Sequence, residues 1–196
     1  MLALLAALAL TQVYSAPQPV NGDNWTFGEV PEGDVAWDFV VGWEVIIRPD
    51  GSIQECETTS TSGNPDVDDG ACLILQKRAR FRPAKAPDGT PMYGVFRGWT
   101  EWGRRRERHN NFKVIVDNLP EKIRLPASVD IVFLVDTDGR PSFCADQYSD
   151  DHPALVSIAC ERLPSTLATP AIQTEANELV PTVQNATAIF VTEAKR

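Results

Sequence analysis

Residues 44–84, EVIIRPDGSIQECETTSTSGNPDVDDGACLILQKRARFRPA, contain the pattern on which the fold depends. The run of Val, Ile and Trp at residues 39–47 predicts a β-strand. Asp50-Gly51 follows it and supplies the backbone conformations of a tight hairpin turn. Residues 52–59 are then expected to return as a second strand.

A helix is expected after a polar loop at residues 60–65. Asp66 or Asp68 is expected to cap it, because a short side-chain oxygen can accept hydrogen bonds from the first free N–H groups of a helix. Helical spacing predicts one buried apolar face, made of Val67, Ala71, Ile74 and Leu75. The helix is expected to end near residue 77, and a closing strand is expected at residues 92–102.

The same pattern returns 88 residues later in the chain. This offset separates Gly51 from Gly139, Cys56 from Cys144, Cys72 from Cys160 and Trp102 from Phe190, and the Pro-Ala pairs at 83 and 170 differ by 87. Such landmarks indicate an internal duplication. The predicted fold class is therefore α+β, with two tandem units, each made of a β-hairpin, a helix and a β-strand in an antiparallel sheet.

The four cysteines allow three disulfide pairings. Equal spacing of sixteen residues within each unit favours Cys56–Cys72 and Cys144–Cys160. Loops of that size would stabilise each unit by roughly 3 kcal/mol. A zinc site is the alternative, but no CxxC pair is present to build one. Disulfides predict an exported protein.

The chain divides into four predicted segments. Residues 1–15 fit a signal peptide cleaved near Ser15, because the apolar run is too short to span a bilayer. A buried N-terminal helix is the alternative. Residues 16–38 are expected to form an exposed lead-in with Trp25 and Trp37 as aromatic anchors, followed by the first unit at 39–111 and the second, degenerate unit at 112–196.

Charge is distributed unevenly. The formal net charge of −9 argues against nucleic acid as a partner. Residues 77–113, however, hold eleven of the eighteen Lys and Arg and only three acids. Arg78, Arg80 and Arg82 alternate as on an extended segment, so they could share one face. This basic face is either a binding surface or an ordinary solvated face.

The first unit contains the strand and turn VIIRPDGSI, the loop TSG, the helix through Cys72, and RARFRPA followed by DGTPMYG. In these motifs it resembles the C-terminal domain of the TonB family. The second unit keeps VDIVFLVDTDGRP but has TLATPA in place of RARFRPA. The resemblance extends over residues 39–191.

The resemblance implies a non-enzymatic protein of the bacterial periplasm. Family members bind outer-membrane transporters by taking an extended peptide onto a sheet edge, which links them to transmembrane transport. This chain has neither a charged or His-bearing membrane anchor nor a long Pro-rich spacer. We therefore expect a soluble relative that reaches the membrane only through its partners, and not an energy transducer.

The expected partner-binding residues lie in the basic segment and in the closing strand. They are Arg78, Arg80, Arg82, Arg97, Trp99 and Trp102. The alternative is a structural or dimerisation module of the cell envelope, which packs as a homodimer through Trp99 and Trp102.

Enzyme chemistry is not indicated by any motif. The chain has no phosphate-binding Gly loop and no HExxH helix. His109 lies in a polar linker, and His152 occupies the position of Asn64 in the first unit. We therefore expect no catalytic residue, no cofactor and no bound metal.

Overall fold

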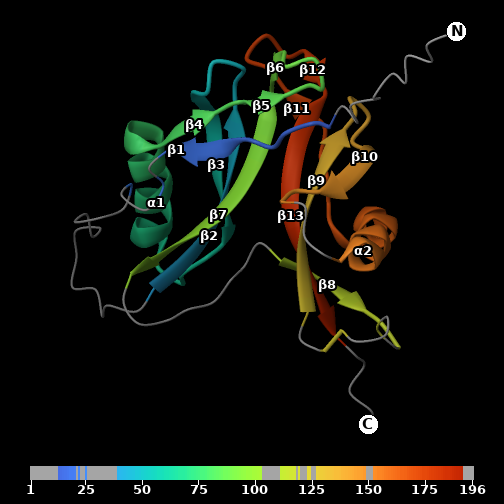
Figure 1. The fold of residues 1–196 in the computed structure, drawn as a ribbon. Coiled ribbons are helices and arrows are strands. Elements are labelled where there is room, and N and C mark those ends of the chain that lie inside the picture. The colour runs from blue at the N-terminus through green and yellow to red at the C-terminus, as the bar shows by residue number, and fades with distance from the viewer. Residues whose placement is uncertain are drawn as a thin grey trace, which may run out of the picture.

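A computed structural model describes residues 13–20, 22, 25, 39–102, 111–117, 119, 123–124, 127–148 and 152–191. The fold is α+β (Figure 1). Its helices are α1 (Pro65–Arg78) and α2 (Pro153–Thr166), and its strands are β1 (Gln18–Val20), β2 (Phe39–Ile47), β3 (Ile53–Ser60), β4 (Arg80–Arg82), β5 (Ala84–Lys85), β6 (Pro91–Met92), β7 (Gly94–Trp102), β8 (Asn111–Ile115), β9 (Ala127–Val135), β10 (Pro141–Asp146), β11 (Ile172–Gln173), β12 (Leu179–Val180) and β13 (Thr182–Val191).

The structure repeats with the offset of 88 residues that the sequence predicts. Six elements of the first unit begin 88 residues before their counterparts: β2 and β9, β3 and β10, α1 and α2, β5 and β11, β6 and β12, β7 and β13. One landmark is wrong. The two Pro-Ala pairs are not equivalent, because Ala84, the first residue of β5, corresponds to Ile172 and not to Ala171.

Turn positions repeat as closely as the helices and strands do. Gly51 and Gly139 have φ of 85° and 79°, and each lies against the backbone of the residue 30 positions later, Phe81 and Thr169 respectively. Gly89, with φ of 87°, corresponds to Asn177, with φ of 60°. Asn is one of the few other residues that adopt this left-handed conformation readily, so the second unit keeps the turn without the glycine.

The two units share a seven-stranded sheet with the order β10-β9-β13-β7-β2-β3. The closing strands β7 and β13 meet in parallel at only two positions, Gly94 with Val183 and Val95 with Gln184. Further along the same edge of β13, β8 replaces β7 and also pairs with β13 in parallel. Within each unit the hairpin and closing strand are antiparallel, as predicted, and the parallel pairings of β13 with β7 and β8 make the combined sheet mixed.

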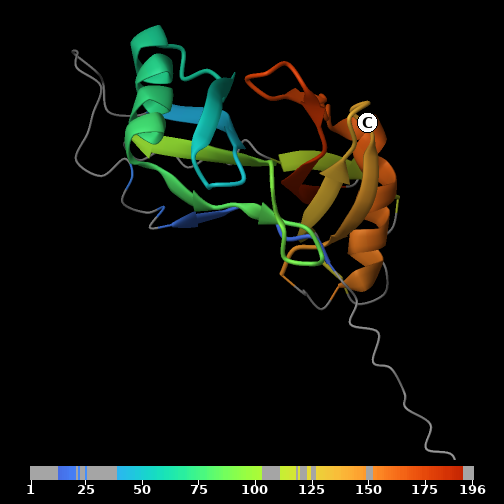
Figure 2. The same cartoon turned by 90° about the horizontal axis from the view of Figure 1, so that it is seen from above.

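The two helices cover opposite faces of this sheet. The Phe96 side chain of β7 points to the face of the sheet that α1 covers. The neighbouring Val95 therefore points to the opposite face. Gln184 pairs with Val95 and shares its face, and the next residue of β13 on that face, Ala186, packs against α2. The units are thus related by a pseudo-twofold axis along the strands, with the helices at either end of the molecule (Figure 2).

Each unit also packs a short hairpin, which is a separate two-stranded sheet, against the other unit. Ala84 of the β5–β6 hairpin packs with Val132 and Val183 of the second unit. Reciprocally, Ile172 of β11 packs with Ile46 and Val95 of the first unit. This exchange extends the apolar core across the junction between the units.

The described part of the N-terminal region is packed against the fold. Ser15 exchanges two backbone hydrogen bonds of 3.0 Å with Lys85, and β1 pairs with β4. Ala16 and Trp25 are buried. The expectation of an exposed lead-in is therefore wrong for these residues, although Trp25 is the aromatic anchor that was predicted; Trp37 lies outside the described residues.

Both predicted disulfides are present. Cys56 of β3 is bonded to Cys72 of α1, and Cys144 of β10 is bonded to Cys160 of α2, with Cα separations of 5.6 and 5.7 Å. Each disulfide therefore fixes a helix onto the second strand of its hairpin.

The helix α1 begins differently from the prediction. Asn64 is its N-cap, and the Asn64 side chain accepts a hydrogen bond from the Asp66 N–H. Neither Asp66 nor Asp68 is the cap. The predicted apolar face is correct, because Val67, Ala71, Ile74 and Leu75 are all buried. None of the helices in the described residues is long and apolar enough to traverse a bilayer.

Candidate binding site

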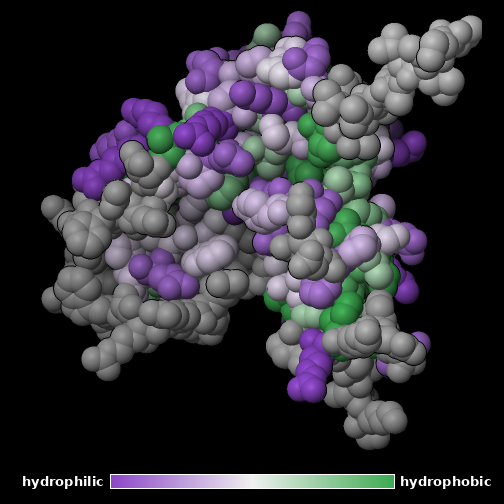
Figure 3. All heavy atoms as spheres, viewed as in Figure 1, coloured by the Kyte–Doolittle hydropathy of each residue, from purple (hydrophilic) through white to green (hydrophobic). Residues whose placement is uncertain are grey.

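The basic segment is divided between two elements. Arg78 is the last residue of α1, and its Nη1 donates a long hydrogen bond of 3.5 Å to the Trp25 carbonyl. Arg80 and Arg82 lie on β4 and are both exposed, on either side of the buried Phe81. The prediction that Arg80 and Arg82 share one face is correct, and Figure 3 shows hydrophilic residues gathered over β4 and the end of α1.

Arg97 is a structural residue and not an exposed binding residue. Its side chain is 8% exposed, and its Nε lies 2.7 Å from Glu44 Oε2. Its Nη2 donates to Gln184 Oε1 of β13 at 2.9 Å. Burial lowers the pKa of Arg97, and the neighbouring Glu44 carboxylate opposes that change. Arg97 therefore connects the first unit to the second at the point where β7 and β13 meet.

The predicted tryptophans lie on opposite faces of β7. Trp102 is only 7% exposed and packs with Val41 of β2 and with Ile74 of α1. It belongs to the core of the first unit, so its assignment to a partner or dimer surface is wrong. Trp99, on the other face, is 37% exposed.

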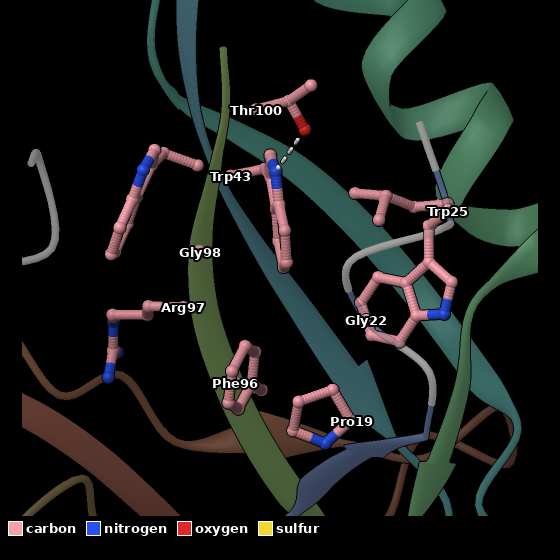
Figure 4. Close-up of a pocket in the computed structure, with 10 residues that line it drawn as sticks. Pro19, Gly22, Trp25, Trp43, Phe96, Arg97, Gly98 and Thr100 are labelled. Atoms are coloured by element: carbon pink, nitrogen blue, oxygen red, sulfur yellow. Dashed lines mark hydrogen bonds between the residues drawn. The ribbon is translucent and has the colours of Figure 1, made fainter. Parts of the chain in front are cut away.

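Trp25, Trp43 and Phe96 form an aromatic pocket that was not predicted (Figure 4). The pocket has a volume of about 210 Å³ and lies on the α1 face of the sheet. The Trp43 ring lies flat over Gly98, where a Cβ atom would be 2.3 Å from the ring. Its Nε1 donates to Thr100 Oγ1 at 3.0 Å, so both the position and the tilt of the ring are fixed.

A groove runs between β3 and α1. It consists of two hollows of about 600 and 460 Å³, both of which Gln76 lines. The first is lined by the Cys56–Cys72 disulfide, Glu57, Thr58, Asp69 and Leu73, and the second by residues 50–53, Ala79, Arg80 and Phe81. We call these two hollows together the β3–α1 groove.

The β3–α1 groove has an apolar centre. Glu57 and Asp69 make its first hollow acidic, and Asp50 and Arg80 place charges of both signs in its second. Leu73, which is 55% exposed, lies beside the disulfide. Asp69 lines the groove toward the start of α1, and Arg80 lines it beyond the end of α1. Because β3 is the last strand of the described sheet on this side, the groove lies next to a free strand edge.

The remaining candidate residues are not brought together. His152 is the N-cap residue of α2, but its side chain makes no capping hydrogen bond. His109 lies outside the described residues. Within the part of the chain that the structure describes, there is no group of three His, Cys, Asp or Glu residues placed to hold a metal ion.

The groove and the aromatic pocket both depend on contacts between distant segments. Trp25 meets Trp43 and Phe96 only because β1 packs beside β4, and the sequence carries no local signal of that packing. The groove could have been anticipated from the predicted disulfide, because it requires the helix to lie along the return strand. Comparisons with protein-family models, curated proteins and solved structures gave no match.

Proposed function

We propose that this protein is a TonB-like, non-enzymatic binding protein that takes an extended peptide onto the edge of β3. The observation that carries the proposal is an eight-residue strand at the end of the sheet, with the β3–α1 groove alongside it. A free strand edge presents backbone N–H and C=O groups that can pair with another chain. An added strand would gain affinity from those hydrogen bonds and selectivity from side chains in the groove.

The groove defines the peptide that would fit. Alternate side chains of an added strand point to the same face, so every second side chain would enter the groove. A small apolar residue suits the centre, where Leu73 and the disulfide lie. A basic residue suits the end lined by Glu57 and Asp69, and a polar residue suits the end lined by Asp50 and Arg80. Arg80 thereby keeps the partner-binding role that the basic segment predicted for it.

The arrangement of the two units favours β3 over the closing strands as the docking edge. β7 is paired to β13 at Gly94 and Val95, and β13 is paired to β8 over Thr187–Val191. The outer edge of β3 has no such partner in the described sheet.

The partner and compartment follow from the family resemblance. The resemblance supports an outer-membrane transporter as the partner, a role linked to transmembrane transport, and a location in the bacterial periplasm. Two disulfides suit that compartment, because disulfides persist where the environment is oxidising.

The test is an NMR titration of the isotope-labelled protein with a short synthetic peptide from the periplasm-facing N-terminus of an outer-membrane transporter. Saturable shifts of the β3 amide resonances are expected. Leu73→Asp should weaken binding about tenfold or more, since it removes an apolar contact at the centre of the groove. Leu179→Asp is the matched control, because Leu179 is a similarly exposed leucine in the second unit. Absence of β3 shifts would reject the proposal.

Dimerisation in the cell envelope would use the same edge in a different way. The strands β3 and β10 are the two ends of the described sheet, so either could pair with a second copy. Sedimentation equilibrium distinguishes the two functions. A dimer that dissociates in the Leu73→Asp variant would replace the peptide-binding proposal, whereas a monomer at all concentrations would support it.

A further inference from the structure

A polar hollow of about 280 Å³ lies where β7 and β13 diverge. Trp99 of β7 lines one side, and Asn185 of β13 and Asp130 of β9 line the other. Tyr148, which follows β10, contributes an aromatic rim. We call this the seam pocket, because its walls come from both units and sites between units are frequent places for ligands.

The seam pocket contains hydrogen-bond acceptors that the protein does not fully use. Asn185 Oδ1 is buried and has no hydrogen-bond partner among the described groups. A buried acceptor without a donor is unfavourable, so a donor that reached Asn185 Oδ1 would be favourable. Asp130 accepts from Thr187 Oγ1 through one carboxylate oxygen, Oδ1, and its other oxygen accepts none from the residues that the structure describes.

The aromatic rim is close to these acceptors. The Tyr148 hydroxyl accepts a hydrogen bond of 3.0 Å from Gln147 Nε2. Burial, and the negative charge of the nearby Asp130, raise the pKa of Tyr148. Tyr148 is 62% exposed and Trp99 is 37% exposed, so both retain exposed surface at the pocket.

We propose that the seam pocket binds a neutral saccharide. A sugar ring offers hydroxyl donors to Asn185 Oδ1 and Asp130, while its C–H face packs on an aromatic ring. The Arg97 guanidinium lines the same hollow, and its charge is balanced by the Glu44 carboxylate. The volume holds about one sugar ring and is below the usual range for larger ligands.

The test uses saturation-transfer NMR on the full chain, with N-acetylglucosamine and glucose as probes. Transfer to the ring protons of at least one sugar is expected, together with a shift of the Asn185 side-chain amide resonances. Tyr148→Ala should weaken binding about threefold to tenfold through the lost ring contact. Asp130→Asn should also weaken it, while its amide oxygen can still accept from Thr187.

The control variant is Asp138→Asn, which changes an exposed carboxylate in a turn of the same unit. Sugar binding by this variant should equal that of the original chain. The proposal is overturned if neither sugar shows transfer, or if Tyr148→Ala and Asp130→Asn bind as well as the control. Binding of lysine methyl ester in place of the sugars would also overturn it, because the pocket would then accept a cation. The readouts lie in the seam pocket, so this result does not depend on peptide binding at β3.

Discussion

Asp68 shows how one buried carboxylate organises the start of α1. Its Oδ1 accepts from the Ser62 N–H at 2.8 Å, and its Oδ2 accepts from the Thr61 hydroxyl. Burial raises the pKa of Asp68, but these hydrogen bonds lower it by more, so the pKa falls below the ordinary value of 3.8. The sequence suggested a helix cap at this position, whereas the side chain instead connects the Thr-Ser-Gly loop to the helix.

The lowered pKa predicts the pH dependence of an Asp68→Asn variant. At pH 7 the variant should lose about 1–2 kcal/mol of unfolding free energy, since hydrogen bonds to a charged group are weakened. A lowered pKa gives stability that is present above the unfolded-state pKa of about 3.9 and is lost as pH falls through the folded-state pKa. The difference between the two proteins should therefore shrink below about pH 4. Urea unfolding between pH 7 and pH 2 measures it.

Asp66→Asn is the control for Asp68, because Asp66 is an exposed carboxylate in the same turn of α1. It should change the unfolding free energy by less than about 0.5 kcal/mol. A constant difference between Asp68→Asn and the original chain over the whole pH range would contradict the assignment of this effect to the Asp68 charge.

At the scale of elements, local signals predicted the parts of the chain that have their own periodicity. The strand expected at residues 39–47 has the bounds of β2, and the helix face of α1 is as predicted. The closing strand of the second unit, β13, begins at Thr182. Its first residues include Thr182 and Gln184, polar side chains that are buried only because β7 and β9 flank them.

Short strands were beyond local prediction for the same reason. β1 is three residues of a proline-containing segment, and it is a strand because β4 lies beside it. A strand of this kind is specified by its neighbour more than by its own residues.

The disulfides are the element-scale feature with the clearest energetic consequence. Each closes a loop with a sequence separation of 16 between a strand and a helix. Replacing Cys56 and Cys72 together by Ala should lower the unfolding free energy by about 3 kcal/mol. The equivalent change at Cys144 and Cys160 should have a similar effect, because the loops have equal length. Urea unfolding under non-reducing conditions checks both; a loss below about 1 kcal/mol in either unit would contradict the loop-closure argument.

At the scale of the whole molecule, the sequence predicted two units but not how they join. Arg97 and Trp102 were assigned to a binding surface because they lie on an aromatic, basic strand. In the structure, one face of that strand is covered by α1, and its edge meets β13. Which residues of a strand are exposed depends on the elements that pack against it. The sequence pattern of residues 92–102 does not predict those elements.

The junction can be tested through Arg97 and Glu44, which lie across neighbouring strands and are joined to Gln184 of the second unit. Arg97→Met should lower the unfolding free energy by about 3–5 kcal/mol, because Glu44 is left largely buried without its partner. Adding Glu44→Met should restore most of that loss, since two apolar side chains can replace a buried ion pair at little cost. Urea unfolding of the two single variants and the double variant gives the coupling energy. If the losses of the two single variants simply add in the double variant, Arg97 and Glu44 do not act as a pair. If the Gln184 resonances are unchanged in Arg97→Met, Arg97 does not hold the second unit in place.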